Sequence, residues 1–138
     1  MKKKKKLNII RQKPNMLIIR LAVCDEWHNF VLDTGSDSCT IDKSVFENVD
    51  NIYSQCNKEV AIGDTPDGSI SIFGYIDIPL TIDDKQVEWP FAISNIHKVF
   101  EAIEKEHDIK ISGLIGCDFM EYYKTIIDFK RNQITFHM

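Results

Sequence analysis

The stretch that decides the fold is Phe30-Val31-Leu32-Asp33-Thr34-Gly35-Ser36, or FVLDTGS, near the first quarter of the chain. Its apolar start predicts a strand that ends at Asp33 and delivers a carboxylate to the rim of a sheet. Gly35 lets the backbone turn sharply and lets another backbone or a ligand come close. Thr34 supplies a hydroxyl that can lock the turn. Ser36 can donate a hydrogen bond to a nearby carboxylate, which favours the ionised form.

This stretch does not fit two other aspartate-containing or ligand-binding loop motifs. An EF-hand loop needs Gly at position six and Glu at position twelve, but position twelve counted from Asp33 is Ser44. A phosphate-cradling loop needs several glycines and a Lys, and this stretch has one Gly. Taken alone, D-T-G is explained equally well by an ordinary Asx turn at a strand end.

A second signal lies late in the chain, in Ser112–Met120 (SGLIGCDFM) followed by Ile126–Phe129 (IIDF). With these segments in this order, the chain resembles the retroviral-type (retropepsin-like) aspartic proteases in their bacterial single-domain form. The resemblance runs from about Met16 to the C-terminus. It implies a mainly β fold, a closed β-barrel with one or two short helices, and Asp33 as the catalytic residue.

The resemblance also implies how the catalytic loop is supported. Leu114, Ile115 and Gly116 would thread beside the D-T-G loop and buttress it from below. Plain core packing is the alternative for this triplet, and it is compatible with the same fold.

The resemblance further suggests substrate contacts. The turn that contains Gly63, Asp64 and Gly68 would be the tip of a flap over the substrate, or else an ordinary hairpin. Asp37 matches a family Asp that holds the substrate backbone. Retroviral enzymes commonly brace that Asp with an Arg, and Cys117 stands there instead, which leaves the role of Asp37 open.

Only one D-T-G occurs in the 138 residues, and there is no D-S-G. Peptide hydrolysis by two carboxylates needs them about 3 Å apart, sharing one proton. The chemistry therefore requires a homodimer in which Asp33 faces the same residue of a second chain across a two-fold axis. Thr34 of each chain would brace the other's loop, and the strand-forming Ile134–His137 is expected to pair across the interface.

Charge divides the chain into an arm and a body. Residues 1–13 carry seven bases and no acids, whereas residues 14–138 carry 10 bases and 21 acids, a net of −11. We expect a disordered basic arm over 1–13 and one domain over 14–138. The arm could instead bind nucleic acid, an anionic membrane surface or the acidic body of its own dimer. The acidic body argues against nucleic acid as a partner, because it repels phosphate.

The apolar runs and the cysteines predict the compartment and the absence of a metal or cofactor. The apolar run Leu7–Ile10 is too short for a secretory signal, and no later run is long enough to span a bilayer, so cytoplasmic residence is expected. The four cysteines form no C-x-x-C pair and have no histidine cluster beside them, which favours reduced thiols and no metal or cofactor. Cys39 is expected to be buried, and the scattered histidines are expected to be surface or packing residues.

Period changes along the chain predict the remaining elements. Residues 25–29 are expected to connect a hairpin, and Tyr75–Ile82 alternates as a strand does. Apolar residues at helical spacing predict a helix over 95–107, with Ser94 or Asn95 as its N-cap. A short helix near 118–122 and strands over 125–129 and 133–137 are expected to follow.

The first hypothesis is therefore an aspartic endopeptidase that cleaves polypeptides as a homodimer. The alternative is a catalytically idle barrel of the same fold that serves as a binding or dimerisation module. A nucleic-acid-associated protein that uses the lysine arm is the third. The intact D-T-G favours the first hypothesis over the second.

Overall fold

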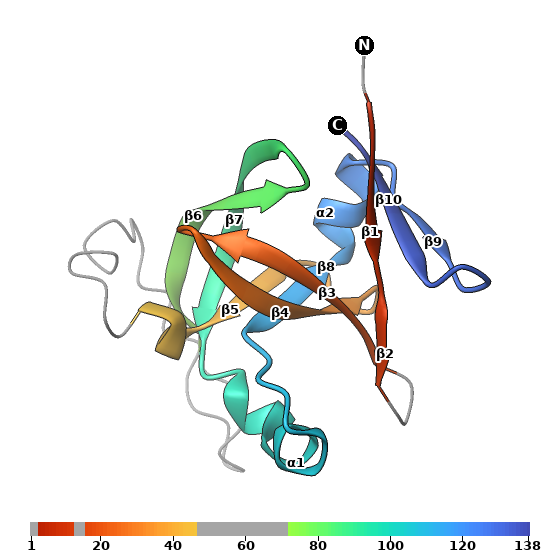
Figure 1. The fold of residues 1–138 in the computed structure, drawn as a ribbon. Helices are drawn as coiled ribbons and strands as arrows, with labels where there is room; N and C mark the ends of the chain where they lie inside the picture. The colour runs from red at the N-terminus through yellow and green to blue at the C-terminus, as the bar shows by residue number, and fades with distance from the viewer. Residues whose placement is uncertain (1–2, 13–15, 47–71) are drawn as a thin grey trace.

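The structure is a computed structural model that describes residues 3–12, 16–46 and 72–138 (Figure 1). Its strands are β1 (Lys4–Asn8), β2 (Ile10–Gln12), β3 (Met16–Val23), β4 (Glu26–Asp33), β5 (Cys39–Asp42), β6 (Ile72–Ile82), β7 (Lys85–Ser94), β8 (Gly113–Gly116), β9 (Ile126–Asp128) and β10 (Gln133–His137). Its helices are a 3₁₀ turn (Lys43–Phe46), α1 (His97–His107) and α2 (Cys117–Tyr122). The expected flap residues Gly63, Asp64 and Gly68 lie outside the described residues.

Six strands close into a barrel in the order β3-β4-β8-β5-β7-β6, because β6 pairs back onto β3. The parallel pairs are β4 with β8 and β5 with β7, and the other neighbours run antiparallel. The mainly β closed barrel expected from the sequence is thus confirmed. Closure leaves these six strands without an open sheet edge between them.

Alternation along the strands explains the core. In β6, Ile76, Ile78, Leu80 and Ile82 are all buried, while every second residue between them is more exposed. They pack with the buried rings of the main cluster, which belong to Phe30, Phe91, Phe119 and Phe136. Full burial of each such side chain contributes about 1.5–3 kcal/mol to folding. The period-two pattern expected for Tyr75–Ile82 is confirmed, and the strand begins three residues earlier.

The turn between β3 and β4 is tighter than expected. It consists of Cys24 and Asp25, whose φ angles of 50° and 66° suit a two-residue hairpin. The expected connection over 25–29 was wrong, because residues 26–29 already pair with β3. The cross-strand pairs of Trp27 and His28 with β3 extend β4 beyond its apolar part.

Both expected helices are present, as α1 and α2. The expected N-cap of α1 was wrong. Ile96 holds the cap position and makes no side-chain cap hydrogen bond. The first helical N–H, that of His97, is bonded instead by the carboxylate of Asp42, which comes from the end of β5 (2.9 Å). Asp42, from a distant strand, thus caps the helix in place of a local N-cap side chain.

We expected the basic arm to be disordered, but most of its described residues form strands. Lys4–Asn8 forms β1 along β10, and Ile10–Gln12 forms β2 along β3. β1, β10 and β9 form a second sheet in that order, here called the terminal sheet, whereas β2 extends the sheet of the barrel. The terminal sheet stands beside the barrel, and Lys3 and Met138 exchange backbone hydrogen bonds at its end (Figure 1). The expected boundary at residue 13 therefore does not follow the fold. Burial alternates along the lysines, as it does in a strand that packs on one face. Lys5 is 8% exposed and bonds Asp84 of the β6–β7 turn, which holds the arm on the domain.

Among the helices that the structure describes, none has the length and apolarity needed to cross a membrane.

Candidate active site

Asp33 is the last residue of β4, and its neighbour in the sheet is the end of β8. The two strands run parallel, with Phe30 opposite Gly113 and Asp33 opposite Gly116. This register places Leu114 and Ile115 directly alongside the strand that leads to Asp33. The two sequence signals, about eighty residues apart in the chain, therefore meet at one end of the barrel, where β4 and β8 both end.

The loop after Asp33 is held by backbone hydrogen bonds. Ser36 N–H donates to the Asp33 carbonyl (3.1 Å), and Cys117 N–H donates to the Ser36 carbonyl (2.7 Å). The Asp33 carboxylate accepts one hydrogen bond through Oδ1, from Gly35 N–H (3.0 Å). A methyl group on Gly35 would lie 3.3 Å from that oxygen, so glycine leaves room for the carboxylate. The hydrogen bond that forms the Asx turn therefore also fixes the position of the Asp33 carboxylate at the rim.

Asp33 remains open to further partners. Its side chain is half-buried, and in the described part of the chain Gly35 N–H is its one hydrogen-bond donor. Thr34 and Asp37 beside it are exposed. A carboxylate can accept about four hydrogen bonds, so most of its capacity is unused. The Asp33 carboxylate can therefore accept further hydrogen bonds from a ligand or from a second chain.

The role expected for the Ser36 hydroxyl was wrong. We expected it to donate to a carboxylate, but it donates to the carbonyl of Ser38 within the same loop (2.8 Å). The hydroxyl therefore stabilises the loop backbone and does not bond Asp33.

Gly116 shows why the late motif needs glycine. A Cβ on this residue would lie 2.5 Å from the Ser38 carbonyl oxygen, which is too close for any side chain. Its N–H points at the buried Sγ of Cys39 (3.3 Å). Burial raises the pKa of the Cys39 thiol, which makes it a packing group and confirms the expected burial. The D-T-G loop, β5 and β8 are thus packed backbone against backbone.

A hollow of about 250 Å³ opens beside Thr34. Its wall comes from the loop after Asp33, from α2 and from β9 with the residue before it: Thr34, Cys117, Met120, Glu121, Thr125 and Ile127. The hollow therefore joins the loop of Asp33 to the terminal sheet.

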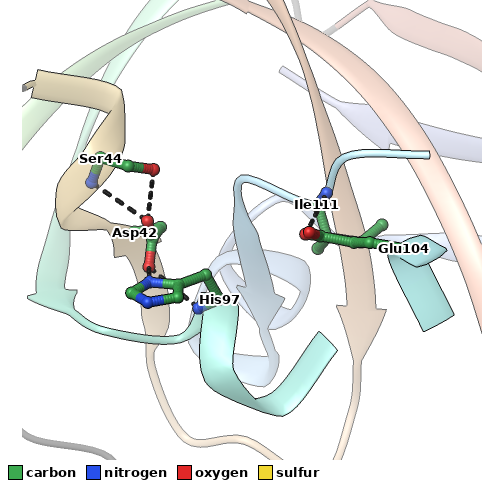
Figure 2. A network of polar contacts seen from close by, with 5 residues as sticks. All are labelled: Asp42, Ser44, His97, Glu104 and Ile111. Carbon is green, nitrogen blue, oxygen red and sulfur yellow. Dashed lines mark hydrogen bonds and ion pairs between the residues drawn. The ribbon is translucent and has the colours of Figure 1, made fainter. Parts of the chain in front are cut away.

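A second carboxylate site was missed by the sequence analysis (Figure 2). Asp42 is 1% exposed, and its Oδ1 accepts from the backbone N–H (2.9 Å) and the Nδ1–H (2.8 Å) of His97. Its Oδ2 accepts from the N–H (3.0 Å) and the hydroxyl of Ser44. Figure 2 also shows Glu104 of α1 accepting from the N–H of Ile111 (2.9 Å), a second tether of this helix. The D-x-S spacing signals the local half of the Asp42 site, but nothing local signals His97.

The environment of Asp42 keeps it ionised. Burial by itself raises the pKa of this carboxyl, but the hydrogen bonds from Ser44 and His97 together outweigh burial and leave the pKa below its usual value. All its strong acceptor positions are filled, so this site is structural. Across the described residues, no group of His, Cys, Asp and Glu could hold a metal ion.

Comparison with known proteins gives a result for the fold. No family model and no curated protein matches the chain. Among solved structures it is similar to the retroviral protease-like domain of Ddi1 from Leishmania major, with 18% identity over 90% of each chain and a TM-score of 0.66. The fold is retropepsin-like. A retropepsin-like aspartic protease from Rickettsia conorii is also similar, with 16% identity, a TM-score of 0.64 and coverage of 99% of this chain and 94% of that one.

At these identities the likeness concerns the arrangement of the chain. The retropepsin-like barrel expected from the two motifs is confirmed, and the D-T-G segment lies within the matched length. What the chain does must be argued from its own residues.

Proposed function

We propose that this protein is an aspartic endopeptidase that hydrolyses peptide bonds as a homodimer, with Asp33 of each chain forming one active site. The observation that carries the proposal is the under-used carboxylate of Asp33, held by the Gly35 N–H at the rim of a retropepsin-like barrel. A carboxylate with one hydrogen bond and partial exposure is available to a water molecule or to a second carboxylate. The alternative, an idle barrel, accounts for the Asx turn but gives no role to the spare acceptor capacity of Asp33.

The chemistry follows from bringing two such groups together. Two carboxylates about 3 Å apart cannot both ionise, so they share one proton. The ionised member takes a proton from a water molecule as its oxygen attacks the scissile carbonyl carbon. The neutral member donates a hydrogen bond to the carbonyl oxygen and stabilises the charge that develops there. A proton then passes to the amine as the C–N bond breaks.

Neighbouring side chains complete the proposed site. Thr34 is exposed beside Asp33, where its hydroxyl can reach the loop of the second chain. Asp37 is exposed four residues after Asp33, where its carboxylate can accept N–H groups of a bound peptide. Leu114, Ile115 and Gly116 support the loop through the pairing of β8 with β4.

The test pairs wild type with Asp33→Asn against a peptide library from acidic to neutral pH. The variant should cleave at least about 10²-fold more slowly, because an amide cannot take a proton from water. It should still fold and dimerise, because two amides lack the repulsion of two carboxylates.

Two outcomes decide between the hypotheses. Equal cleavage by both proteins would exclude Asp33 as the catalytic residue. Absence of cleavage by wild-type dimer at every pH would favour the binding or dimerisation module.

A further inference from the structure

A second pocket borders α2, besides the hollow beside Thr34. It has a volume of about 510 Å³ and is here called the Trp89 pocket. Its wall comes from β7, from α2 and from the turn after α2: Trp89, Asp118, Glu121, Tyr122 and Lys124. A volume of this size lies within the range that is usual for ligand sites.

Two aromatic rings contribute to the wall of the Trp89 pocket. The ring centroids of Trp89 and Tyr122 are 5.3 Å apart, and the ring planes are inclined at 54°. The buried Phe119 packs edge-on against Trp89, also at 5.3 Å. The Nε1–H of Trp89 donates to Oδ2 of Asp118 (2.9 Å), which fixes the orientation of the indole. The faces of such rings attract a cation, because the π-electrons make them negative.

The charges of the pocket also favour a cation. Asp118 and Glu121 contribute two carboxylates and Lys124 one ammonium, so the lining has a net charge of −1. The recorded partners of the Asp118 carboxylate are uncharged, namely the Trp89 indole and the Cys39 thiol (3.6 Å). Within the part of the chain that the structure describes, neither carboxylate forms an ion pair. The pocket therefore presents negative charge that its own chain does not neutralise.

A guanidinium group matches both features of the pocket. It is planar, so it can stack on an aromatic ring while its N–H groups donate to carboxylates beside that ring. An ammonium group is compact and more strongly hydrated, and it gains less from a flat ring. Asp118 lies at the edge of the Trp89 indole, and Glu121 lines the same pocket as the Tyr122 ring. Arginine is therefore the basic side chain that fits this wall best.

The open side of the pocket indicates how the arginine is presented. Glu121, Tyr122 and Lys124 are exposed, and Tyr122 is 60% exposed. Sites for free small molecules usually enclose about 70–90% of the ligand surface. An open pocket instead suits one side chain of a polypeptide whose neighbouring residues lie across the rim. Residues 14–138 carry a net charge of −11, which attracts basic polypeptides.

We propose that the Trp89 pocket binds an arginine side chain of a partner polypeptide. The guanidinium stacks against Trp89 and Tyr122 and donates hydrogen bonds to Asp118 and Glu121. This interaction goes beyond the proposed hydrolysis, because it uses none of the residues of the Asp33 loop.

The position of the pocket on α2 keeps the two sites apart. Cys117 and Met120 line the hollow beside Thr34, whereas Asp118 and Tyr122 line the Trp89 pocket. The pocket therefore lies on a different side of α2 from the hollow, and binding there requires neither a second chain nor peptide cleavage.

The test follows the indole N–H signals of isotope-labelled protein by NMR, because the chain has two tryptophans, Trp27 and Trp89. A Trp27→Phe variant assigns the two signals. The probe is a blocked pentapeptide with one arginine between glycines, and it should shift the Trp89 signal saturably. Trp27 is 64% exposed and already has the guanidinium of Arg20 over its ring (5.7 Å), so its signal should not move.

Two further probes identify the chemistry that is recognised. The same peptide with citrulline, an uncharged isostere of arginine, should bind at least about 10-fold more weakly, because it loses both the cation–π and the ionic contribution. Free arginine should bind at least about threefold more weakly than the peptide, because its own carboxylate is repelled by the acidic wall.

Matched variants localise the binding site. Glu121→Gln and Glu101→Gln each remove one exposed carboxylate from a helix, but Glu101 lies on α1, which β8 separates from α2 (Figure 1). Glu121→Gln should raise the Kd of the arginine peptide about threefold or more, and Glu101→Gln should leave it unchanged. Lys124→Gln should lower the Kd by about twofold or more, because it removes the one cation of the wall.

Circular dichroism checks that these variants fold, and all three replaced side chains are exposed. A Trp89 signal that does not move, or equal binding of the arginine and citrulline peptides, would overturn the proposal. Equal effects of Glu121→Gln and Glu101→Gln would do the same. Free arginine that binds as tightly as the peptide would exclude a polypeptide as the partner. Because the readout is binding and can be taken in Asp33→Asn protein, failure of the proposed peptidase activity would leave this result unchanged.

Discussion

Asp33 and Asp42 lie nine residues apart, each at the end of a strand, and the protein treats them in opposite ways. Asp42 is 1% exposed and accepts four hydrogen bonds, two from Ser44 and two from His97. Asp33 is half-buried and accepts one from the residues that the structure describes, that of Gly35. Both carboxylates sit in Asx turns, so the local turn does not distinguish them.

The difference is in what surrounds each turn. The Asp42 carboxylate is enclosed by a helix start and a 3₁₀ turn, and its bonding capacity is full. A filled carboxylate stabilises a fold, whereas one with spare capacity at a rim can bind and react. Function is therefore expected to depend on Asp33, and stability on Asp42.

The largest expected effect is on catalysis and tests both halves of the comparison. Asp33→Asn should lower the turnover rate by about 10²–10⁴-fold. Asp42→Asn should leave the rate per folded dimer unchanged, because the described partners of the Asp42 carboxylate are Ser44 and His97 and not the loop of Asp33. Titrating active sites with a tight inhibitor normalises the rates to the folded dimer. A large loss of turnover in Asp42→Asn alone would break the comparison.

Stability should show the reverse order. Asp42→Asn removes a charged acceptor and places an NH₂ group against donors, so it should lower the free energy of unfolding by about 1–3 kcal/mol. Asp33→Asn should change it by less than about 0.5 kcal/mol at a site with so few contacts. Urea unfolding at neutral pH measures both. Equal destabilisation by the two variants would contradict the distinction drawn from the hydrogen bonds.

Acid should reduce the contribution of Asp42 to the free energy of unfolding. Its pKa is lower in the folded than in the unfolded protein, so the ionised carboxylate stabilises the fold above the unfolded value of 3.8. That stability is lost as pH falls through the lower folded pKa. The difference in unfolding free energy between wild type and Asp42→Asn should therefore be constant near neutral pH and shrink below about pH 4. Unfolding at a series of pH values checks this, and a difference that grows in acid would contradict it.

The smallest expected difference is the one between two serine hydroxyls. Ser44→Ala removes a donor to the buried Asp42 carboxylate and should cost about 1.5–3 kcal/mol, the range for bonds to charged groups. Ser36→Ala removes a bond to the exposed carbonyl of Ser38 and should cost about 1 kcal/mol or less. Thermal unfolding of the two variants side by side measures the difference. A greater loss in Ser36→Ala would show that the loop after Asp33 depends on the Ser36 hydroxyl.

Local pattern was sufficient for much of this protein. Alternation in Tyr75–Ile82 predicted a strand, and helical spacing in 95–107 predicted a helix. The resemblance carried by the two glycine motifs implied a mainly β barrel in which the D-T-G turn ends a strand. These features depend on residues close in the chain, which fold with period two or 3.6 wherever they pack. The steric need for glycine at Gly116 is likewise visible as a motif, although its cause, the Ser38 carbonyl, is not.

Tertiary structure decided what depends on distant partners. His97 meets Asp42 across 55 residues, and Lys5 meets Asp84 across 79. From its charge alone, the arm was expected to be solvated. In the fold, Asp84 of an exposed turn pairs with Lys5, and β10 supplies the backbone partners of β1. By sequence, Asp33 and Asp42 are two aspartates at strand ends. Only the fold determines which one is enclosed by donors, because burial and hydrogen bonding depend on every element packed around a side chain.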